Sequence, residues 1–274
     1  MTLLSPAEAK RCCADLYASD WLRFLLGDSL HPGGLALTEQ IGATLGLLPS
    51  TRVLDVATGA GTSARAIAQR FGCQVVGLDY SARNFRPAES RTQPARVGGR
   101  VRCICGDAEH LPFASASFDA VLCECAFSTF ADKALVATEL RRVLVPGGRL
   151  GFSDVTRHRD LPPELQGPVA AMACIADARS PADYAAYLEA GGFAIDAIAP
   201  HDDALEQLVH GVRGKLVGAE LLTKLGKLAD PGIDFITAKS MARRAVEEVR
   251  AGNLGYTVIL ATASAQAGPN ATVS

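Results

Sequence analysis

The stretch RVLDVATGAGTSARAIAQRFG, residues 52–72, decides the fold of this chain. It begins with a continuous apolar segment, passes through a glycine-rich turn and continues with apolar residues at helical spacing. An unbroken apolar strand is typical of a parallel sheet that is buried on both faces. Gly59 and Gly61 let the backbone turn tightly and let a ligand approach it closely. The stretch therefore predicts a strand, turn and helix with a ligand site at the turn.

Two well-known phosphate-binding signatures also contain a glycine-rich turn of this kind. The turn in this chain does not contain the G-x-x-x-x-G-K-[ST] pattern of a P-loop. At the third glycine of the dinucleotide fingerprint the chain has Ala64, which that motif tolerates. A glycine pair that serves packing alone is the competing interpretation of the turn taken by itself.

Strand and helix patterns continue to alternate on the C-terminal side of the turn. Apolar strands are predicted at CQVVGLD, RVRCICGDA, FDAVLCECAF and RLGFSDV, with a helix at KALVATELRRVL closed by PGG. This alternation predicts an α/β doubly wound parallel sheet with right-handed crossovers. Farther on, the sequence predicts Pro-interrupted helix over 161–178, a helix capped by Ser180, and strands at FAIDAIAPHD and GYTVILATAS.

These patterns divide the chain into five parts. We expect an N-terminal helical cap, a core, a helical insertion, a final core strand and a disordered tail, over residues 1–48, 49–203, 204–252, 253–264 and 265–274.

Composition narrows the class of function. The formal net charge is −2 and no long basic run exists, so neither a nucleic acid nor an anionic membrane is an expected partner. No apolar run is long enough to span a membrane, and no signal-peptide core is present. We expect a cytoplasmic protein whose eight cysteines are reduced thiols. No CxxC pair occurs, which argues against a zinc ribbon.

Acidic residues end three consecutive predicted strands. Asp55 precedes the turn, Asp79 ends the second strand and Asp107 follows the third. Ligands of open α/β sheets bind at the carboxyl ends of the strands, where an acid can accept a ribose hydroxyl. A single acid at a strand end is usually a helix N-cap or a solvated loop residue. Acids at three consecutive strand ends instead favour an adenosine-containing ligand.

The motifs VLDVATGAGT, VVGLD, GDAEHLPFASASFDAVLC and ELRRVLVPGGRLGFSDV together resemble those of class I S-adenosylmethionine-dependent methyltransferases. The resemblance covers about residues 30–200 and is strongest to the ubiquinone and menaquinone branch. It implies a Rossmann-like sheet of seven strands with the last antiparallel, and S-adenosyl-L-methionine as cofactor. It also implies these cofactor-binding residues: Asp55, Ala57, Gly59, Gly61, Asp79, Tyr80, Asp107, Ala108 and Glu124, with Tyr17, Gly33 and Gly34 as weaker candidates.

The cysteines divide into core and substrate candidates. Cys73, Cys103, Cys105 and Cys123 lie on predicted buried strands and are expected in the core, where free cysteine is common. Cys125 ends the fourth strand, at the mouth of the expected site.

Cysteine placement also resembles that of arsenite methyltransferases. In that family one substrate cysteine follows the fourth strand and another precedes a helix leading to AGF, which implies Cys125 and Cys174 here, with Cys12 and Cys13 as weaker candidates. Trivalent arsenic is soft and prefers thiolates. Glutathione or another thiol is a candidate partner. The family's cysteine before the first strand is missing, because the chain has Gly33 and Gly34 near that place.

Two other functions stay open. A methyltransferase for a quinone-like or other organic acceptor would need a base, for which His31 in LHPGG or His158 is available. A thiol-rich protein that binds a metalloid without catalysis is the third hypothesis. No His/Asp/Glu group has the spacing of a hard-metal site.

Overall fold

The computed structural model describes residues 14–15, 17, 19–27, 29–84, 99–165, 175, 177–226 and 234–264. Seven strands form one sheet, in the order β3-β2-β1-β4-β5-β7-β6. Their bounds are β1 Arg52–Val56, β2 Gln74–Asp79, β3 Val101–Cys105, β4 Phe118–Glu124, β5 Leu144–Arg157, β6 Phe193–Pro200 and β7 Leu254–Ala263. β1 to β5 pair in parallel, and β7 runs antiparallel between β5 and β6. The predicted fold class is confirmed, including the antiparallel last strand.

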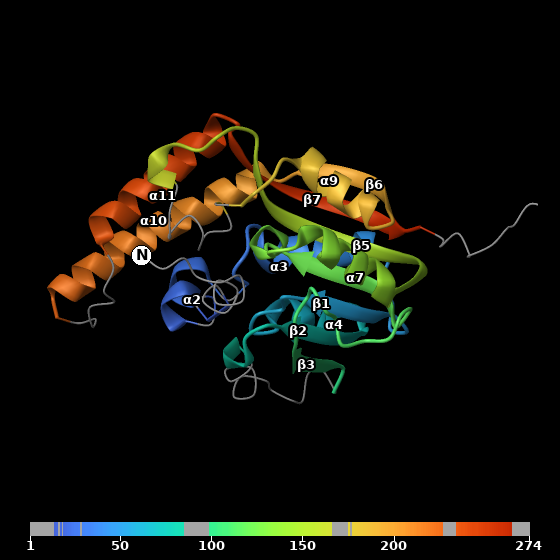
Figure 1. Ribbon diagram of the computed structural model, residues 1–274. Helices are drawn as coiled ribbons and strands as arrows, with labels where there is room; N and C mark the ends of the chain where they lie inside the picture. The colour runs from blue at the N-terminus through green and yellow to red at the C-terminus, as the bar shows by residue number, and fades with distance from the viewer. Residues whose placement is uncertain are drawn as a thin grey trace, which may run out of the picture.

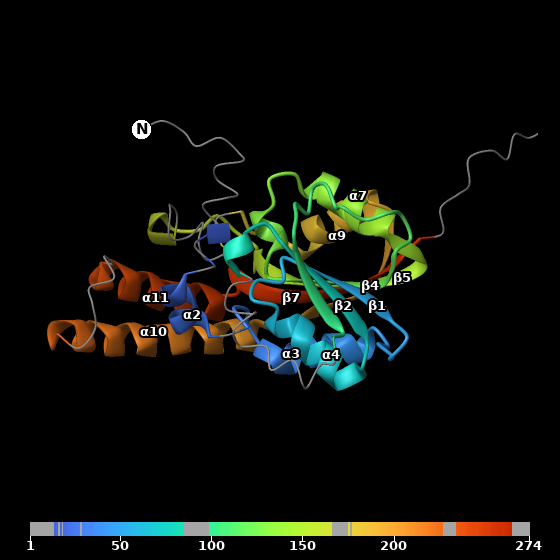
Figure 2. The same cartoon turned by 90° about the horizontal axis from the view of Figure 1, so that it is seen from below.

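Helices cover both faces of this sheet (Figure 1). The α-helices are α2 Asp20–Leu26, α3 Gly34–Thr44, α4 Thr62–Phe71, α7 Lys133–Val143, α9 Pro181–Ala190, α10 Asp202–Lys224 and α11 Phe235–Arg250, and the 3₁₀ turns are η1 Ala82–Asn84, η2 Phe127–Thr129 and η3 Pro163–Leu165. Figure 2 shows α7 and α9 on one face and α3 and α4 on the other. The long pair α10 and α11 packs together and extends beyond the sheet.

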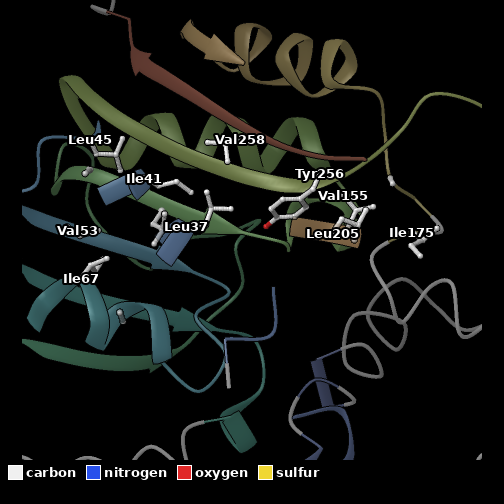
Figure 3. Close-up of a cluster of buried hydrophobic side chains, with 14 of the residues drawn as sticks. Leu37, Ile41, Leu45, Val53, Ile67, Val155, Ile175, Leu205, Tyr256 and Val258 are labelled. Carbon is white, nitrogen blue, oxygen red and sulfur yellow. The ribbon is translucent and has the colours of Figure 1, made fainter. Parts of the chain in front are cut away.

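Alternating strand residues fill two apolar clusters, one on each face. Leu54 and Cys123 point toward the α7 and α9 side, whereas Val53 and Leu122 point toward α3 and α4. Figure 3 shows part of the second cluster, in which residues of α3 lie together with Tyr256 of β7. Burial on both faces explains why β1 and β4 are almost uniformly apolar in sequence.

Helix α3 ends at Thr44, two residues before Gly46, which has a left-handed φ of 67°. One predicted boundary needs correction. Strand β5 begins at Leu144 and contains the PGG segment, which bulges where the register with β4 shifts. Most of the helix predicted over 161–178 lies outside the described residues. Residues 161–165 hold the turn η3, where adjacent prolines remove backbone donors. Helix α9 starts as predicted, with a capping box between Ser180 and Asp183.

Candidate active site

A hollow of about 1070 Å³, part of it open to solvent, lies at the carboxyl ends of β1, β2 and β4. We call it the strand-end pocket. The predicted site residues on its wall are Tyr17, His31, Asp55, Ala57, Gly59, Asp79, Tyr80, Asp107, Ala108, Glu124 and Cys125. The pocket adjoins β1 and β4, between which the strand order reverses, the usual ligand site of an open α/β sheet.

The glycine-rich turn forms one wall. Ala57, Gly59 and Gly61 have φ values of 58°, 55° and 72°, so the backbone is left-handed at alternate positions. Gly61 begins α4 and does not lie on the wall itself. A Cβ atom there would lie 3.1 Å from Arg65 Nη1 and 3.3 Å from Cys103 Sγ. Both the left-handed conformation and the close packing therefore favour glycine at this position.

Asp79 is held in place by three donors. Its Oδ2 accepts from Gly59 N at 2.9 Å, and its Oδ1 accepts from Ser81 N and Asn84 Nδ2, each at 2.9 Å. Burial raises the pKa of this carboxyl, and the three hydrogen bonds oppose the rise. A carboxylate has about four acceptor positions, so Asp79 retains room for a further donor from a ligand.

Asp55 is the most deeply buried of the three acids. Burial raises its pKa to about 7, with the charges of Glu124 and Asp79 adding to the rise, while the Thr58 hydroxyl opposes it by donating at 2.5 Å. Asp107, by contrast, sits in a turn where its Oδ1 accepts from Glu109 N at 3.0 Å. The carboxylates at the strand ends make the pocket electrostatically suited to a cationic ligand.

A buried polar cluster closes the side of the pocket nearest α3. The Thr38 hydroxyl lies 3.0 Å and 3.1 Å from the two oxygens of Glu124. His31 Nε2 lies 3.3 Å from both Ser63 Oγ and Thr38 Oγ1, and 3.6 Å from Glu124 Oε2. Its Nδ1 lies 3.1 Å from the Pro32 carbonyl, which can only accept, so Nδ1 carries the proton.

Sequence patterns missed some residues in and behind this wall. Ser63 and Asn84 line the pocket, Thr38 lies behind it, and none of the three belongs to a motif that the sequence singles out, whereas Thr58 belongs to the quoted VLDVATGAGT stretch without an expected role. Only the packing of α3 and α4 against the sheet brings Thr38 to Glu124 and Ser63 to Thr38.

Cys125 lies directly beyond the end of β4, on the pocket wall. Its backbone has a φ of 52°, which is unusual outside glycine, and its N–H donates to the Ser153 carbonyl at 2.7 Å. The side chain is partly buried against the cluster that contains Tyr256. Cys123, two residues earlier, is fully buried in the opposite cluster, as expected.

The core prediction is right for Cys73 but wrong for Cys105. Cys73 is fully buried, whereas Cys103 is partly buried and Cys105 is exposed. The reason is topological, because β3 is the edge strand of the sheet and has one neighbour instead of two. An apolar strand pattern does not reveal whether the strand lies at an edge.

Some candidates lie elsewhere. Cys12, Cys13 and Cys174 fall outside the described residues. Gly33 and Gly34 start α3 with φ values of 78° and 54° and do not line the pocket.

His158 is exposed and is absent from the pocket wall, so it is not positioned as a base there. Among the described residues, no group of three His, Cys, Asp or Glu side chains is arranged to hold a metal ion. No helix in the same part of the chain is long and apolar enough to cross a membrane.

This sheet order, with a ligand pocket at the switch point and a glycine turn beside it, defines a class I methyltransferase fold. Residues 54–152 match the family model described as a methyltransferase domain. The chain is 31% identical over 205 residues to an arsenite methyltransferase of Halobacterium salinarum, covering 71% of this chain and 52% of that protein. It is 36% identical over 114 residues to a demethylmenaquinone methyltransferase of Lactiplantibacillus plantarum, covering 41% and 48%.

A solved structure has the same architecture. Phosphoethanolamine N-methyltransferase 2 of Haemonchus contortus, in complex with S-adenosylhomocysteine, superposes with a TM-score of 0.77 at 20% identity, over 96% of this chain and 61% of that one. Residues 54–152 thus match a methyltransferase domain, and the whole described chain has the class I methyltransferase fold. The chain spans about half the length of the two curated relatives.

Proposed function

We propose that the protein transfers a methyl group from S-adenosyl-L-methionine to trivalent arsenic held by the thiolate of Cys125. The observation that carries the proposal is the position of this cysteine. It is the one thiol among the described residues that lies on the wall of the strand-end pocket. The match to an arsenite methyltransferase supports the same acceptor.

The pocket fits the cofactor in chemistry. Its acids complement a ligand that carries a sulfonium and an ammonium group. In the proposed arrangement Asp79 accepts from the ribose hydroxyls, and Asp107 with the Ala108 backbone contacts the adenine. Gly59 lies beneath the methionine part, and Glu124 faces its ammonium group.

The bound cofactor supplies an electrophilic methyl group on a positively charged sulfur. The protein's main task is to hold the acceptor in line with that carbon in a pocket with little water. Leu30, Ala126 and Phe130 provide apolar wall for this purpose. With the cofactor bound, the arsenic lone pair would form the new bond to carbon as the carbon–sulfur electron pair returned to sulfur, which takes arsenic formally from As(III) to As(V). Two thiols such as glutathione would return it to the trivalent state as they form a disulfide. No proton leaves the acceptor, so no catalytic base is required.

Cys174 is the proposed second thiolate. The next residue, Ile175, is 8% exposed and belongs to the apolar cluster against which Cys125 and Tyr17 pack. The chain on the C-terminal side of Cys174 is therefore anchored in the cluster that Cys125 contacts. A small thiol such as glutathione is the expected third ligand of the arsenic.

The test is methyl transfer from labelled S-adenosyl-L-methionine to arsenite in the presence of glutathione, with products identified by mass. We expect Cys125→Ser to lower turnover by about a hundredfold, the scale of a misplaced reactant. Binding of S-adenosylhomocysteine should remain within about twofold. Cys73→Ala, in the core and outside this pocket, is the control for loss of a thiol and should retain activity. Unchanged arsenite methylation by Cys125→Ser would refute the proposed acceptor site.

An organic acceptor is the second candidate, and the placement of His31 on the pocket wall favours it. Its Nε2 is already close to Ser63, Thr38 and Glu124, so a base role would require that arrangement to change. A panel of quinols and phenols in the same assay tests this candidate. Their methylation, lost in His31→Gln and kept in Cys125→Ser, would replace arsenic as the acceptor. Tight arsenic binding without any methylated product would indicate a sequestration protein.

A further inference from the structure

Two thiols outside the strand-end pocket share one face of β3. Cys103 and Cys105 are two residues apart on an extended strand, so their side chains point the same way. That face is the one toward α4, because Val101 packs in the cluster containing α4 residues while Ile104 packs in the other. The close approach of Cys103 Sγ to Gly61 agrees with this orientation.

We propose that Cys103 and Cys105 form a dithiol site for a trivalent arsenical, separate from the acceptor site at Cys125. Occupation of this site weakens cofactor binding through the neighbouring Tyr80. The site goes beyond the proposed methyl transfer and does not depend on arsenic being the acceptor.

The spacing of the two thiols favours a bridging atom over a disulfide. Residues two apart on a strand have Cα atoms about 6.6 Å apart, from a rise of about 3.3 Å per residue. This lies near the upper limit of about 6.8 Å for a disulfide, whose usual separation is about 5.5–6 Å. Neither cysteine is in a disulfide in the structure. An arsenic atom between the sulfurs lengthens the link and relieves that constraint.

The two thiols differ in solvent exposure, which predicts the order in which they react with the arsenical. Cys105 is exposed and accessible from solvent. Cys103 is partly buried, and burial raises its pKa, with the charges of Asp55 and Asp79 adding to the rise and Arg65 opposing it. The exposed thiol is therefore expected to react first. The second reacts within the same molecule, at a high effective concentration.

Cys105 also contacts the wall of the strand-end pocket. Its Sγ donates to the Tyr80 carbonyl at 3.3 Å. It lines a second, shallower hollow together with Tyr80, Gly106 and Asp107, and these three residues also line the strand-end pocket. An arsenical on Cys105 removes the contact to Tyr80 and places bulk against the adenine end of the pocket.

The reaction is balanced without a redox partner. The As=O group of phenylarsine oxide, or its hydrate, condenses with two thiols. Two arsenic–sulfur bonds form, the oxygen leaves as water with the two thiol protons, and arsenic stays trivalent. Soft arsenic prefers the two thiols over the carboxylate and carbonyl oxygens of the neighbouring residues.

The experiment uses the full chain with Cys12, Cys13, Cys125 and Cys174 replaced by serine, which leaves Cys73 and Cys123 fully buried. Phenylarsine oxide is expected to add once per chain, with loss of both accessible thiols in a thiol titration. The adduct should resist glutathione and be removed by a dithiol. It should also weaken S-adenosylhomocysteine binding by about tenfold or more in calorimetry.

Single replacements and a second measurement decide the result. Cys103→Ser or Cys105→Ser in this background should each abolish the glutathione-resistant adduct. In the wild-type chain, phenylarsine oxide should protect both cysteines from alkylation, as mapped by mass spectrometry. A resistant adduct that survives Cys105→Ser, or alkylation of both thiols despite the arsenical, would overturn the site. If the adduct left the affinity for S-adenosylhomocysteine unchanged, the proposed coupling of the dithiol site to cofactor binding through Tyr80 would be overturned.

Discussion

At the scale of single residues, the environment of Glu124 shows what makes this site unusual. A buried carboxylate is costly unless hydrogen bonds satisfy it. Thr38 supplies such a bond from α3, and His31 stands 3.6 Å away. Glu124 is thereby held on the pocket wall while part of its charge remains available to a cationic ligand.

We predict that Thr38→Val weakens S-adenosylhomocysteine binding by about three- to tenfold, the loss of one hydrogen bond to a charged group. Valine keeps the shape of threonine but cannot orient Glu124. Isothermal titration calorimetry measures the effect. Thr44→Val, on the exposed side of the same helix, is the control and should bind normally. Equal affinities for the two variants would show that Thr38 does not position Glu124.

The backbone of Cys125 allows fold and function to be separated. A φ of 52° costs an ordinary residue about 1 kcal/mol that glycine does not pay. We therefore predict that Cys125→Gly is more stable than Cys125→Ala by about 1 kcal/mol in urea denaturation, while both lose arsenite methylation. A less stable glycine variant would mean that the left-handed conformation is not a source of strain here.

At the scale of elements, α2 is joined to the pocket through η1. Arg23 of α2 is buried, and its Nη2 donates to Asn84 Oδ1 at 3.3 Å. The same amide donates through Nδ2 to Asp79. Trp21 stacks on Phe24 and meets the edge of Phe235 of α11, which fixes α2 from its other side.

Replacing Arg23 should loosen this connection. We predict that Arg23→Met, which keeps the apolar stem, weakens S-adenosylhomocysteine binding by about five- to tenfold, since a charged hydrogen bond is worth about 1.5–3 kcal/mol and only part of it reaches the ligand. Arg70→Met, on the exposed side of α4, serves as the control. If calorimetry finds the same S-adenosylhomocysteine affinity for Arg23→Met and Arg70→Met, α2 does not act on Asp79 through Asn84.

The start of α9 offers a prediction about stability alone. Ser180 Oγ accepts from Asp183 N at 3.1 Å, and the Asp183 carboxylate accepts from Ser180 N at 3.2 Å. Ser180→Ala should lower the free energy of unfolding by about 1 kcal/mol. Ser180→Thr should recover most of it, and cofactor binding should be normal in both. If Ser180→Thr lost as much free energy of unfolding as Ser180→Ala, the loss of the helix cap would be ruled out as the cause.

At the scale of the whole molecule, buried acids shape the dependence of stability on pH. Burial raises the pKa of Asp55 to about 7 and that of Asp154 to about 6, from an ordinary 3.8. Between about pH 4 and these values the folded state retains protons that the unfolded state releases. Each acid therefore makes the folded protein less stable as the pH rises through this window.

Asp55→Asn removes one of these titrations. Without cofactor, the stability of the variant relative to wild type should rise by a few kcal/mol between pH 4 and pH 7, about 1.4 kcal/mol for each pH unit, and then level off. Urea denaturation at several pH values measures this difference, in which the effects of groups that do not interact with Asp55 cancel. A difference that does not change with pH would contradict the raised pKa.

The sequence by itself determined the class of fold and the main acids of the pocket. Apolar strands, a glycine turn and acids at strand ends are local patterns, and the parallel arrangement forces their carboxyl ends to one edge of the sheet. Asp55, Asp79 and Asp107 therefore had to converge near Gly59. Cys125 followed from the same logic, as the residue just beyond β4.

Only the tertiary structure decided the rest. Thr38 reaches Glu124, and Ser63 reaches Thr38, because α3 and α4 pack side by side, a contact between distant segments that no local pattern encodes. Cys105 is exposed because β3 lies at the sheet edge, a property of strand order rather than of strand composition. Arg23 meets Asn84 for the same kind of reason. Periodicity determines which face of an element is apolar, but long-range packing determines what that face or end meets.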